Sequence, residues 1–564
     1  MTNPSTRGVA RSLDRYLSSL FTGILRGKPR RQSRASRCAI RVDACESREM
    51  LSAIVVTSLA DNTTVDGQIT LREAIQAANT NLSVDGSVAG SGADVITFGP
   101  GLNGTIALTL GQLTISETVT ITGNGAANTI IDAQTTSRIF DITNTAGDVT
   151  LNGLTLLNGQ RIGGTDISFN GGAVRSLSTG TLAIHQSILS GNRAAGSGGA
   201  ISSLSGVVRV SQSTLSGNSS MNLGGAVYTE TGDLTVSKST LSGNSSGAGG
   251  GAIASGGGPG LISVSQSTLS GNLVTGSFDR GGGGAILNGG NLFVSQSTIT
   301  GNQAPNSGGG GISTYSGITI HNSIIAGNSD IGFGPDLYKN SGNKPNLFLS
   351  QLTNTLLGTN KGSGGNLAPT VGTTPDANGN FIGGAGANAI DPRLGALRNN
   401  GGSTLTHALL PGSLAIDHGN NALAVDVVND MPLTLDQRGT SFPRIVNTTV
   451  DMGAYEGTFL IVSTNIDELD GDFSGGDLSL REAISIANAS IATIETIGFA
   501  PSTNALPFNL TLGQLVISQS VTIIGNGAKS TIIDAQTNSR IFEMTSSAGD
   551  VTLDGMTLKN GRTT

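Results

Sequence analysis

The nine residues VSQSTLSGN at 210–218 return along the chain as VSKSTLSGN at 236–244, VSQSTLSGN at 264–272 and VSQSTITGN at 294–302. Each copy ends in an asparagine. With the weaker flanking copies included, the closing asparagines follow one another at steps of 26, 26, 28, 30 and 26 residues. Self-similarity with a period of about 20–50 residues is typical of solenoids and other stacked repeats. This period decides the architecture before any single residue is considered.

A second string keeps the same period. It reads GGAV, GGAI or GGGI and closes each time on a β-branched residue: Val174, Ile201, Val227, Ile253, Ile286 and Ile312. Between the two strings lie short alternating segments such as DLTVS at 233–237, and a period of two indicates strands. No helix-length apolar periodicity occurs between residues 105 and 330. Short strands and Gly-rich turns at this period predict the coils of a parallel β-solenoid.

Stacked coils account for the unusual composition, in which 84 of 564 residues are glycine and only 12% are charged. Strands in adjacent coils stand about 4.8 Å apart, so each residue lies on its counterpart in the next coil. Val and Ile are then expected to fill a narrow core, and the asparagines to form an amide ladder. A second ladder is expected for the serines Ser213, Ser239, Ser267 and Ser297. No His or Lys accompanies these serines at every coil, so they do not indicate a nucleophile.

The N-terminal head differs from the body. The chain has a net charge of −7, yet residues 1–50 are rich in Lys and Arg. The body has no basic stripe to continue a contact with nucleic acid, so an export or membrane-surface segment is favoured. The apolar stretch at 16–27 is short, and no stretch reaches the roughly 18 residues of a membrane span. We expect a mostly disordered targeting head, no nucleic-acid partner and no transmembrane span.

Two short helices are predicted from GQITLREAIQAAN at 67–79 and GDLSLREAISIAN at 476–488. Each carries the hydroxyl and the carboxylate of a capping box three residues apart. These pairs are Thr70 with Glu73 and Ser479 with Glu482. The apolar residues Leu71, Ala74, Ile75 and Ala78 lie on one helical face. A short amphipathic helix ahead of a solenoid is expected to act as a lid on its open end.

The chain contains a second, incomplete copy of this arrangement. Residues 108–160 align without gaps to residues 510–562, but no GGA coil follows the second copy. The sequence therefore predicts one whole module and the opening of another, as in a truncated or fragmentary gene product. Because a coil satisfies its backbone by pairing with coils on both sides, we expect self-association through the open end of the second module.

Several motifs resemble those of bacterial exported proteins. The LREAI pair resembles the CSLREAI-like modules that precede bacterial β-helix repeats, although Ile69 and Leu478 stand where many modules carry cysteine. The alternation of GGA[IV] with a closing xxGN resembles polymorphic outer-membrane protein repeats. Residues 390–420 and 434–456 resemble a choice-of-anchor Q-like domain, and ACESREMLSA at 44–53 resembles a head motif of cell-surface proteins. These resemblances imply a right-handed parallel β-helix outside the bacterial cytoplasm, without implying a catalytic site.

Enzymes of the pectate-lyase-like class also have β-helices, so a polysaccharide-acting enzyme is the main alternative. Such a lyase needs carboxylates for calcium and a basic residue on one strand face. The acids and bases between 171 and 330 do not recur in register at neighbouring coils. A site could lie earlier, in a group comprising Asp132, Arg138, Asp141, Asp148 and Asp166. Asp132 and Arg138 reappear in the second copy as Asp534 and Arg540, which predicts a structural pair instead.

The richest polar cluster lies near the end of the first module. It comprises Asp417, His418, Asp436, Arg438, Arg444, Asp451 and Glu456. One interpretation is an ion-pair network that holds the irregular end of the solenoid, and the other is a cation site.

A calcium site is indicated by DGDFSGGD at 470–477. Asp470, Asp472 and Ser474 occupy positions 1, 3 and 5 of an EF-type loop. Position 12 is Arg481, where a bidentate acid belongs, so an acidic surface turn is the alternative. Calcium is the one cofactor that the sequence suggests.

The sequence thus predicts an all-β protein, a right-handed parallel β-helix with short capping helices. Its expected parts are a basic head at 1–54, a capping segment at 55–104, β-helix repeats at 105–389, the choice-of-anchor-like part at 390–457 and the truncated second module at 458–564. The expected function is non-enzymatic, as a rigid adhesive or presenting structure, secreted or on the cell surface or outer membrane of a bacterium. Glycans or other cell-surface components are the expected partners. The alternatives are a pectate-lyase-like enzyme and a structural stalk of a larger surface protein.

Overall fold

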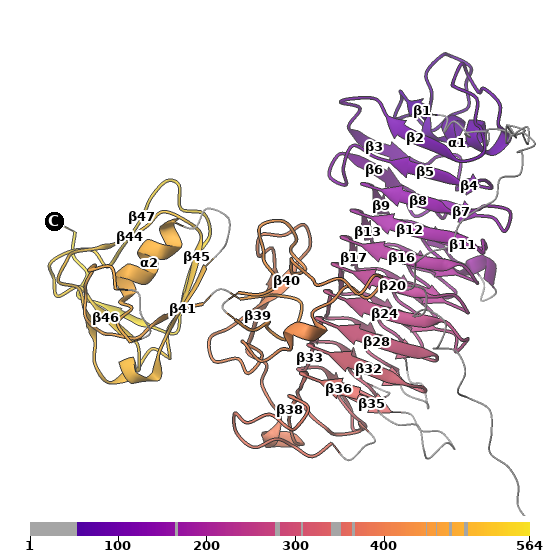
Figure 1. The fold of residues 1–564 in the computed structure, drawn as a ribbon. Coiled ribbons are helices and arrows are strands. Elements are labelled where there is room, and N and C mark those ends of the chain that lie inside the picture. The colour runs from indigo at the N-terminus through magenta and orange to yellow at the C-terminus, as the bar shows by residue number, and fades with distance from the viewer. Residues whose placement is uncertain are drawn as a thin grey trace, which may run out of the picture. The chain divides into compact units, whose positions relative to one another are not determined.

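A computed structural model describes most of the chain from Ala53 to Thr563 (Figure 1). The described ranges are 53–163, 167–276, 282–305, 308–339, 351–363, 367–446, 448–457, 459–472, 476–489 and 495–563. The predicted head at 1–54 lies outside these ranges except for its last two residues, which begin the first strand. Asp166 and Ser474 also lie outside them.

The first module is a parallel β-solenoid, and the predicted fold class is confirmed. Sheet A consists of β1 (Ala53–Val56), β2 (Asp94–Phe98), β5 (Val119–Thr122), β8 (Val149–Asn152), β12 (Thr181–His185), β16 (Val207–Ser211), β20 (Leu234–Ser237), β24 (Leu261–Ser265), β28 (Asn291–Ser295), β32 (Ile318–His321) and β36 (Gln351–Thr353). Sheet B consists of β3 (Gly104–Ala107), β6 (Thr129–Asp132), β9 (Thr155–Leu157), β13 (Ile188–Ser190), β17 (Thr214–Ser216), β21 (Thr240–Ser242), β25 (Thr268–Ser270), β29 (Thr298–Thr300), β33 (Ile324–Ile325), β37 (Leu356–Leu357) and β38 (Phe381–Ile382).

Two further sheets complete the wall of the solenoid. Sheet C consists of β4 (Leu113–Ile115), β7 (Phe140–Ile142), β11 (Val174–Ser176), β15 (Ile201–Ser203), β19 (Val227–Thr229), β23 (Ile253–Ser255), β27 (Ile286–Asn288), β31 (Ile312–Thr314) and β35 (Leu337–Lys339). The short sheet D consists of β10 (Gln160–Arg161), β14 (Arg193–Ala194), β18 (Ser219–Ser220), β22 (Ser245–Ser246), β26 (Leu273–Val274), β30 (Gln303–Ala304) and β34 (Ser329–Asp330). Successive members of each sheet come from successive coils, as in Figure 1.

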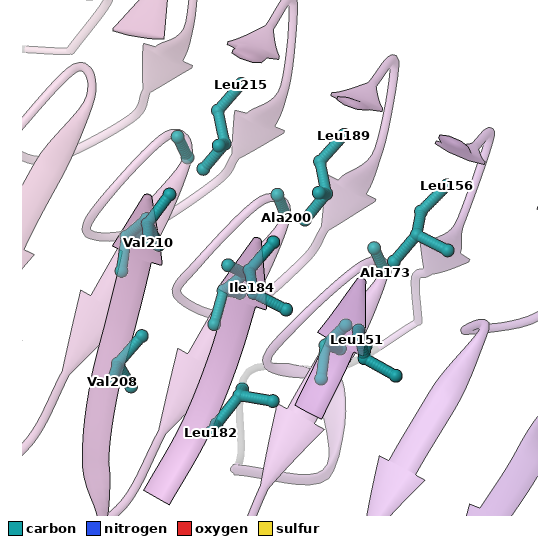
Figure 2. Packing of buried hydrophobic residues seen from close by; sticks show 14 of the residues in the cluster. Leu151, Leu156, Ala173, Leu182, Ile184, Leu189, Ala200, Val208, Val210 and Leu215 are labelled. Carbon is teal, nitrogen blue, oxygen red and sulfur yellow. The ribbon is translucent and has the colours of Figure 1, made fainter. Parts of the chain in front are cut away.

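The core is a stack of apolar side chains inside the coils. The GGA[IV] string and its GGGI variant end at the first residue of six sheet C strands, β11, β15, β19, β23, β27 and β31, and Val227 pairs in register with Ile201 and Ile253. All three are fully buried. Figure 2 shows the same arrangement for sheet A, where Leu151, Ile184 and Val210 from successive coils point into the interior. The predicted inward stack of β-branched residues is confirmed.

Both predicted ladders are present. The asparagine carboxamides bond from coil to coil: Asn192 to Asn218 (2.9 Å), Asn218 to Asn244 (3.0 Å), Asn244 to Asn272 (2.9 Å), Asn272 to Asn302 (2.8 Å) and Asn302 to Asn328 (2.8 Å). In the serine ladder each backbone N–H donates to the hydroxyl of the next coil, as from Ser213 to Ser239 (3.1 Å) and from Ser239 to Ser267 (3.2 Å). The repeated polar residues therefore hold neighbouring coils together.

The solenoid begins beneath α1 (Leu71–Thr80), whose predicted capping box is present. Its apolar face joins the core cluster, so the helix covers the first coil as expected. Arg72 adds a clamp that spacing did not predict, because its Nε donates to Asp61 (2.7 Å) and its Nη2 to the carbonyl of Gly111 (2.7 Å).

Residues 390–457 form an irregular segment that packs on the outer face of sheet B. It contains the antiparallel pair β39 (Leu394–Arg398) and β40 (Thr406–Leu409), and the short 3₁₀ turn η3 (Asn421–Leu423). Ala408, Leu409, Ala415, Met452 and Tyr455 share one apolar cluster with Ile324, Leu356 and Phe381, which belong to sheet B strands. Two more 3₁₀ turns lie elsewhere in the first module, η1 (Ile167–Phe169) and η2 (Gly386–Asn388).

The second module has its own core. It contains α2 (Leu480–Ala489), with the capping box of Ser479 and Glu482, and the 3₁₀ turn η4 (Pro501–Ala505). Its parallel sheets are β41 (Phe459–Val462), β42 (Glu495–Phe499), β45 (Val521–Ile524) and β48 (Val551–Asp554); β43 (Phe508–Asn509), β46 (Ile532–Asp534) and β49 (Thr557–Lys559); and β44 (Leu515–Ile517) with β47 (Phe542–Met544).

Candidate functional site

The early charged cluster is a structural network, but its pairing differs from the prediction. Arg138 is buried and lies 3.4 Å from Asp141, not beside Asp132. Its other donors reach the carbonyls of Ser168, Asn170 and Gly171 in the next coil (each 2.8 Å).

Asp132 instead accepts from the backbone of Gln134 (2.8 Å) and from the carboxamide of Asn158 (3.0 Å). Asp141 also binds Arg175 through Nε at 2.7 Å. Burial lowers the pKa of Arg138 to about 10, and the charge of Asp141 opposes this shift. Asp148 accepts from the backbone of Thr181 (2.7 Å), so it links two adjacent coils. The predicted pair of Asp132 with Arg138 is therefore wrong.

The polar cluster of the 390–457 segment is a buried ion-pair network. The carboxylate of Asp436 lies 2.6 Å from Nη2 of Arg438. The guanidinium of Arg438 lies between the rings of Phe442 and Tyr455, at 4.0 and 3.9 Å from their centroids. A site with two aromatic rings to stack on and a carboxylate to pair with suits the planar guanidinium of arginine in particular.

The second half of this network surrounds Arg444, which has no exposed surface. Its Nη2 donates to the carbonyls of Asp451 and Gly453 (both 2.9 Å), and Nη1 lies 3.7 Å from Oε2 of Glu456. Burial raises the pKa values of Asp451 and Glu456, and repulsion by Asp417 on Asp451 and by Asp451 on Glu456 adds to this, although Arg444 and backbone N–H donors oppose the shift. The carboxylates cap backbone amides of the segment, which supports the interpretation as a network that holds the end of the solenoid.

The acidic turn after β41 is described only in part. The carboxylate of Asp470 accepts from the backbone of Asp472 (2.9 Å), and Glu482 accepts from the backbones of Asp470 (3.2 Å) and Gly471 (3.1 Å). Arg481, at position 12 of the loop pattern, is bound to Asp467 at 2.7 Å. Among the residues with a described placement, no group of three or more His, Cys, Asp or Glu side chains is arranged to hold a metal ion. Calcium at Asp470, Asp472 and Ser474 stays a prediction.

A row of corner amides, which sequence reasoning missed, attaches the 390–457 segment to the solenoid. The residue between the two serines of each VSxS string has a positive φ, as at Gln266 (44°) and Gln296 (42°). The Gln296 side chain donates to the carbonyl of Leu423 (2.6 Å), and Gln266 donates to that of Leu435. One signal was available: this position varies among Gln, Lys and Asn while its neighbours hardly change.

The attached segment leaves a groove against the outer face of sheet A. Its floor includes Ser263, Phe293 and Thr319 of β24, β28 and β32, and its wall includes Val425 and Asp430. The cavity volume is about 400 Å³, within the range of small-molecule sites. A second cavity, beside Arg175, Tyr228 and Glu230, has a volume of about 20 Å³ and can hold one water. The larger groove is the candidate binding site.

In the part of the chain that the structure describes, no helix is both long enough and apolar enough to cross a bilayer.

Comparison with known proteins gives one family match and distant structural likenesses. The model of the Chlamydia polymorphic membrane protein repeat matches residues 186–204, which run from the corner before β13 into the segment after β15. A search of curated proteins by sequence found no match.

Among solved structures, the chain is similar to a PL6 family alginate lyase, AlyGC, with 13% identity over 91% of this chain and 72% of that chain and a TM-score of 0.28. It is similar to an arginine-to-alanine mutant of AlyGC with 11% identity over 83% and 69% of the two chains and a TM-score of 0.21. These scores are too low to bear on the activity of this chain. The predicted likeness to polymorphic membrane protein repeats is confirmed for the matched residues, and the CSLREAI-like and choice-of-anchor Q-like resemblances stay predictions.

Proposed function

We propose that this protein is a non-enzymatic β-helix protein, exported to a bacterial cell surface or secreted, where it serves as a rigid adhesive or presenting structure. The observation that supports this most is that the repeated polar side chains spend their hydrogen bonds on linking neighbouring coils. In the ladder, the carboxamide of Asn244 donates to Asn272 and to the carbonyl of Leu215 (3.0 Å), and accepts from both nitrogens of Asn218. Such side chains stiffen the wall of the solenoid and are not available to act as acids, bases or nucleophiles.

The charged groups support the same proposal. An enzyme that acts on a polysaccharide needs an acid or base and charge-stabilising groups that converge on the reacting atoms. Arg138 and Arg175 are bound to Asp141, and Arg438 is bound to Asp436, inside their own networks. Of the described residues lining the larger groove, Asp430 alone carries a charge. A groove with one carboxylate and no basic side chain suits binding better than proton transfer.

The family match supports export. The matched repeat is described as belonging to a membrane protein of Chlamydia, and we carry its surface location over to this chain as part of the proposal. The stalk alternative predicts the same location but no binding surface.

Binding by the purified protein tests the proposed role. The protein would be applied to a printed panel of bacterial and host glycans and to whole bacterial and animal cells, with the heat-unfolded protein as control. We expect saturable binding to at least one surface, lost on unfolding. Absence of binding to every glycan and cell would overturn the adhesive role and favour the stalk.

A further inference from the structure

The groove on sheet A is built by two parts of the first module. Its wall is the turn at 425–432, closed by a bridge between Val425 and Pro432 and by the bond from Asp426 N–H to the carbonyl of Met431 (2.8 Å). The corner amide of Gln296 holds the adjacent turn η3 through Leu423. The wall is thus fixed to the coils whose strands form the floor.

The floor follows from the alternation of strand residues. In β24 the side chains of Ile262 and Val264 are buried in the core, so Ser263 faces outward. Ser263 pairs in register with Phe293, and Phe293 with Thr319. An aromatic ring therefore lies between two hydroxyl groups along the axis of the solenoid. The ring of His321 packs edge-on against Phe293 at 5.5 Å and supports its orientation.

One polar group of the floor lacks a partner. Ser263 is 5% exposed, and its hydroxyl has no hydrogen-bond partner. A buried hydroxyl without a partner is unfavourable, and such groups in native proteins call for an explanation. Ser263 lines the groove, so a turn of this side chain toward the groove would let a ligand hydroxyl supply the missing bond.

We propose that this groove binds a neutral saccharide, an inference that rests on the proposed adhesive role and names its ligand class. A sugar ring has apolar C–H faces that can pack on Phe293 and Val425, and hydroxyls that can bond to Ser263, Thr319 and the carboxylate of Asp430. Among the described lining residues, Asp430 is the single charged group. A uronic-acid polymer would bring like charges to that carboxylate, so the groove selects against anionic saccharides.

Three variants test the proposal. Ser263→Ala removes the hydroxyl without breaking a bond within the protein, so the fold is retained. Phe293→Ala removes the stacking surface. The matched control is Thr235→Ala, because Thr235 lies beside Ser263 in the previous strand but does not line the groove.

Binding would be measured by calorimetry with hexamers of glucose, mannose, xylose and N-acetylglucosamine, and with oligogalacturonate and oligoalginate. We expect at least one neutral hexamer to bind, about tenfold more weakly to Ser263→Ala and not measurably to Phe293→Ala. Thr235→Ala should bind like the parent protein, and the anionic oligomers should not bind.

Two patterns of saccharide binding would overturn the groove proposal while leaving the adhesive role standing. One is neutral-saccharide binding that both groove variants retain, and the other is binding of the anionic oligomers alone. If no hexamer binds but the protein still binds cells, the saccharide assignment fails. If it binds neither hexamers nor cells, the proposed function fails with it.

Discussion

At the scale of single residues, the closing asparagine of each repeat is the most informative position in the chain. Asn192, Asn218, Asn244, Asn272 and Asn302 are fully buried, and each carboxamide both donates to and accepts from neighbouring coils. A buried amide is tolerated because all of its bonds are made within the wall. The repeat is thus polar for a structural reason.

Removing one asparagine of the ladder should lower the free energy of unfolding more than removing an exposed asparagine. Asn244→Ala leaves the side chains of Asn218 and Asn272 and the carbonyl of Leu215 each without one partner. We expect a loss of about 3 kcal/mol in the free energy of unfolding, measured by urea denaturation. Asn222→Ala, at an exposed site in the preceding coil, is the control and should change stability by less than about 0.5 kcal/mol. Equal stability of the two variants would contradict the structural role of the ladder.

The sequence predicted this ladder because the period alone brings equal residues into register. It did not predict the partners of Arg138, since those carbonyls belong to residues 168–171 in a glycine-interrupted stretch with no periodic signal. In the second copy the equivalent Arg540 is exposed. Recurrence of Asp132 and Arg138 suggested a pair, but only the contacts of the aspartate recur. Asp132 accepts from the backbone two residues on and from an asparagine of the next coil, and Asp534 does the same.

At the scale of elements, the LREAI helix shows which contacts can be predicted from short-range sequence spacing and which cannot. The capping box of Thr70 and Glu73 could be predicted because its partners lie three residues apart. The clamp of Arg72 on Asp61 could not, because Asp61 also accepts from the backbone of Thr109 (2.6 Å), far along the chain. Desolvation opposes a lower pKa of Asp61, but the bonds from Arg72 and from backbone amides lower it.

The asparagine ladder ends at Asp336, which takes the place of a further asparagine. Its carboxylate accepts hydrogen bonds from the backbone (3.1 Å) and the side chain (2.9 Å) of Asn328. Desolvation raises the pKa of Asp336 to about 6, against the hydrogen bonds that lower it. A raised pKa in the folded state means that the contribution to stability is complete below the ordinary value of 3.8 and is lost as pH rises through about 6.

We therefore expect the melting temperature of the first module to fall between about pH 4 and pH 7, and the fall to be smaller in Asp336→Asn. Calorimetry at a series of pH values measures this, with Asp391→Asn at an exposed site as the control. If Asp336→Asn and the control show the same pH dependence, Asp336 does not titrate in this range.

At the scale of the whole molecule, the repeat period and the lid were accessible from the sequence, whereas the groove was not. The groove exists because residues 390–457 pack on sheet B and send one turn toward the face of sheet A. That packing rests on irregular backbone and on corner amides such as Gln266, whose partner Leu435 lies outside the periodic part of the chain. Only the outward direction of Phe293 follows from strand alternation.

The two copies of the early coils should differ in protection from hydrogen exchange. Leu151 and Leu156 are fully buried between coils, whereas their counterparts Leu553 and Leu558 are partly or largely exposed. In the described chain β48 and β49 pair on one side only. We expect exchange to be much faster across 542–559 than across 140–157, measured by mass spectrometry.

The exposed edge should also promote association. A chain ending at Gly457 is the control, and it should scatter less light than the full chain at the same concentration. Equal protection of the two copies, with no change in association on truncation, would contradict this prediction.

The most direct test of the central claim, that the repeated polar residues build a binding scaffold without catalysis, is a search for reaction products. The purified full-length protein would be incubated with pectin, alginate and neutral polysaccharides in the presence of calcium, and new unsaturated ends would be followed by their ultraviolet absorbance. We predict no increase in absorbance with any polymer, under conditions in which a known lyase gives a strong signal. A sustained increase that depends on the folded protein would contradict the account and establish a polysaccharide lyase.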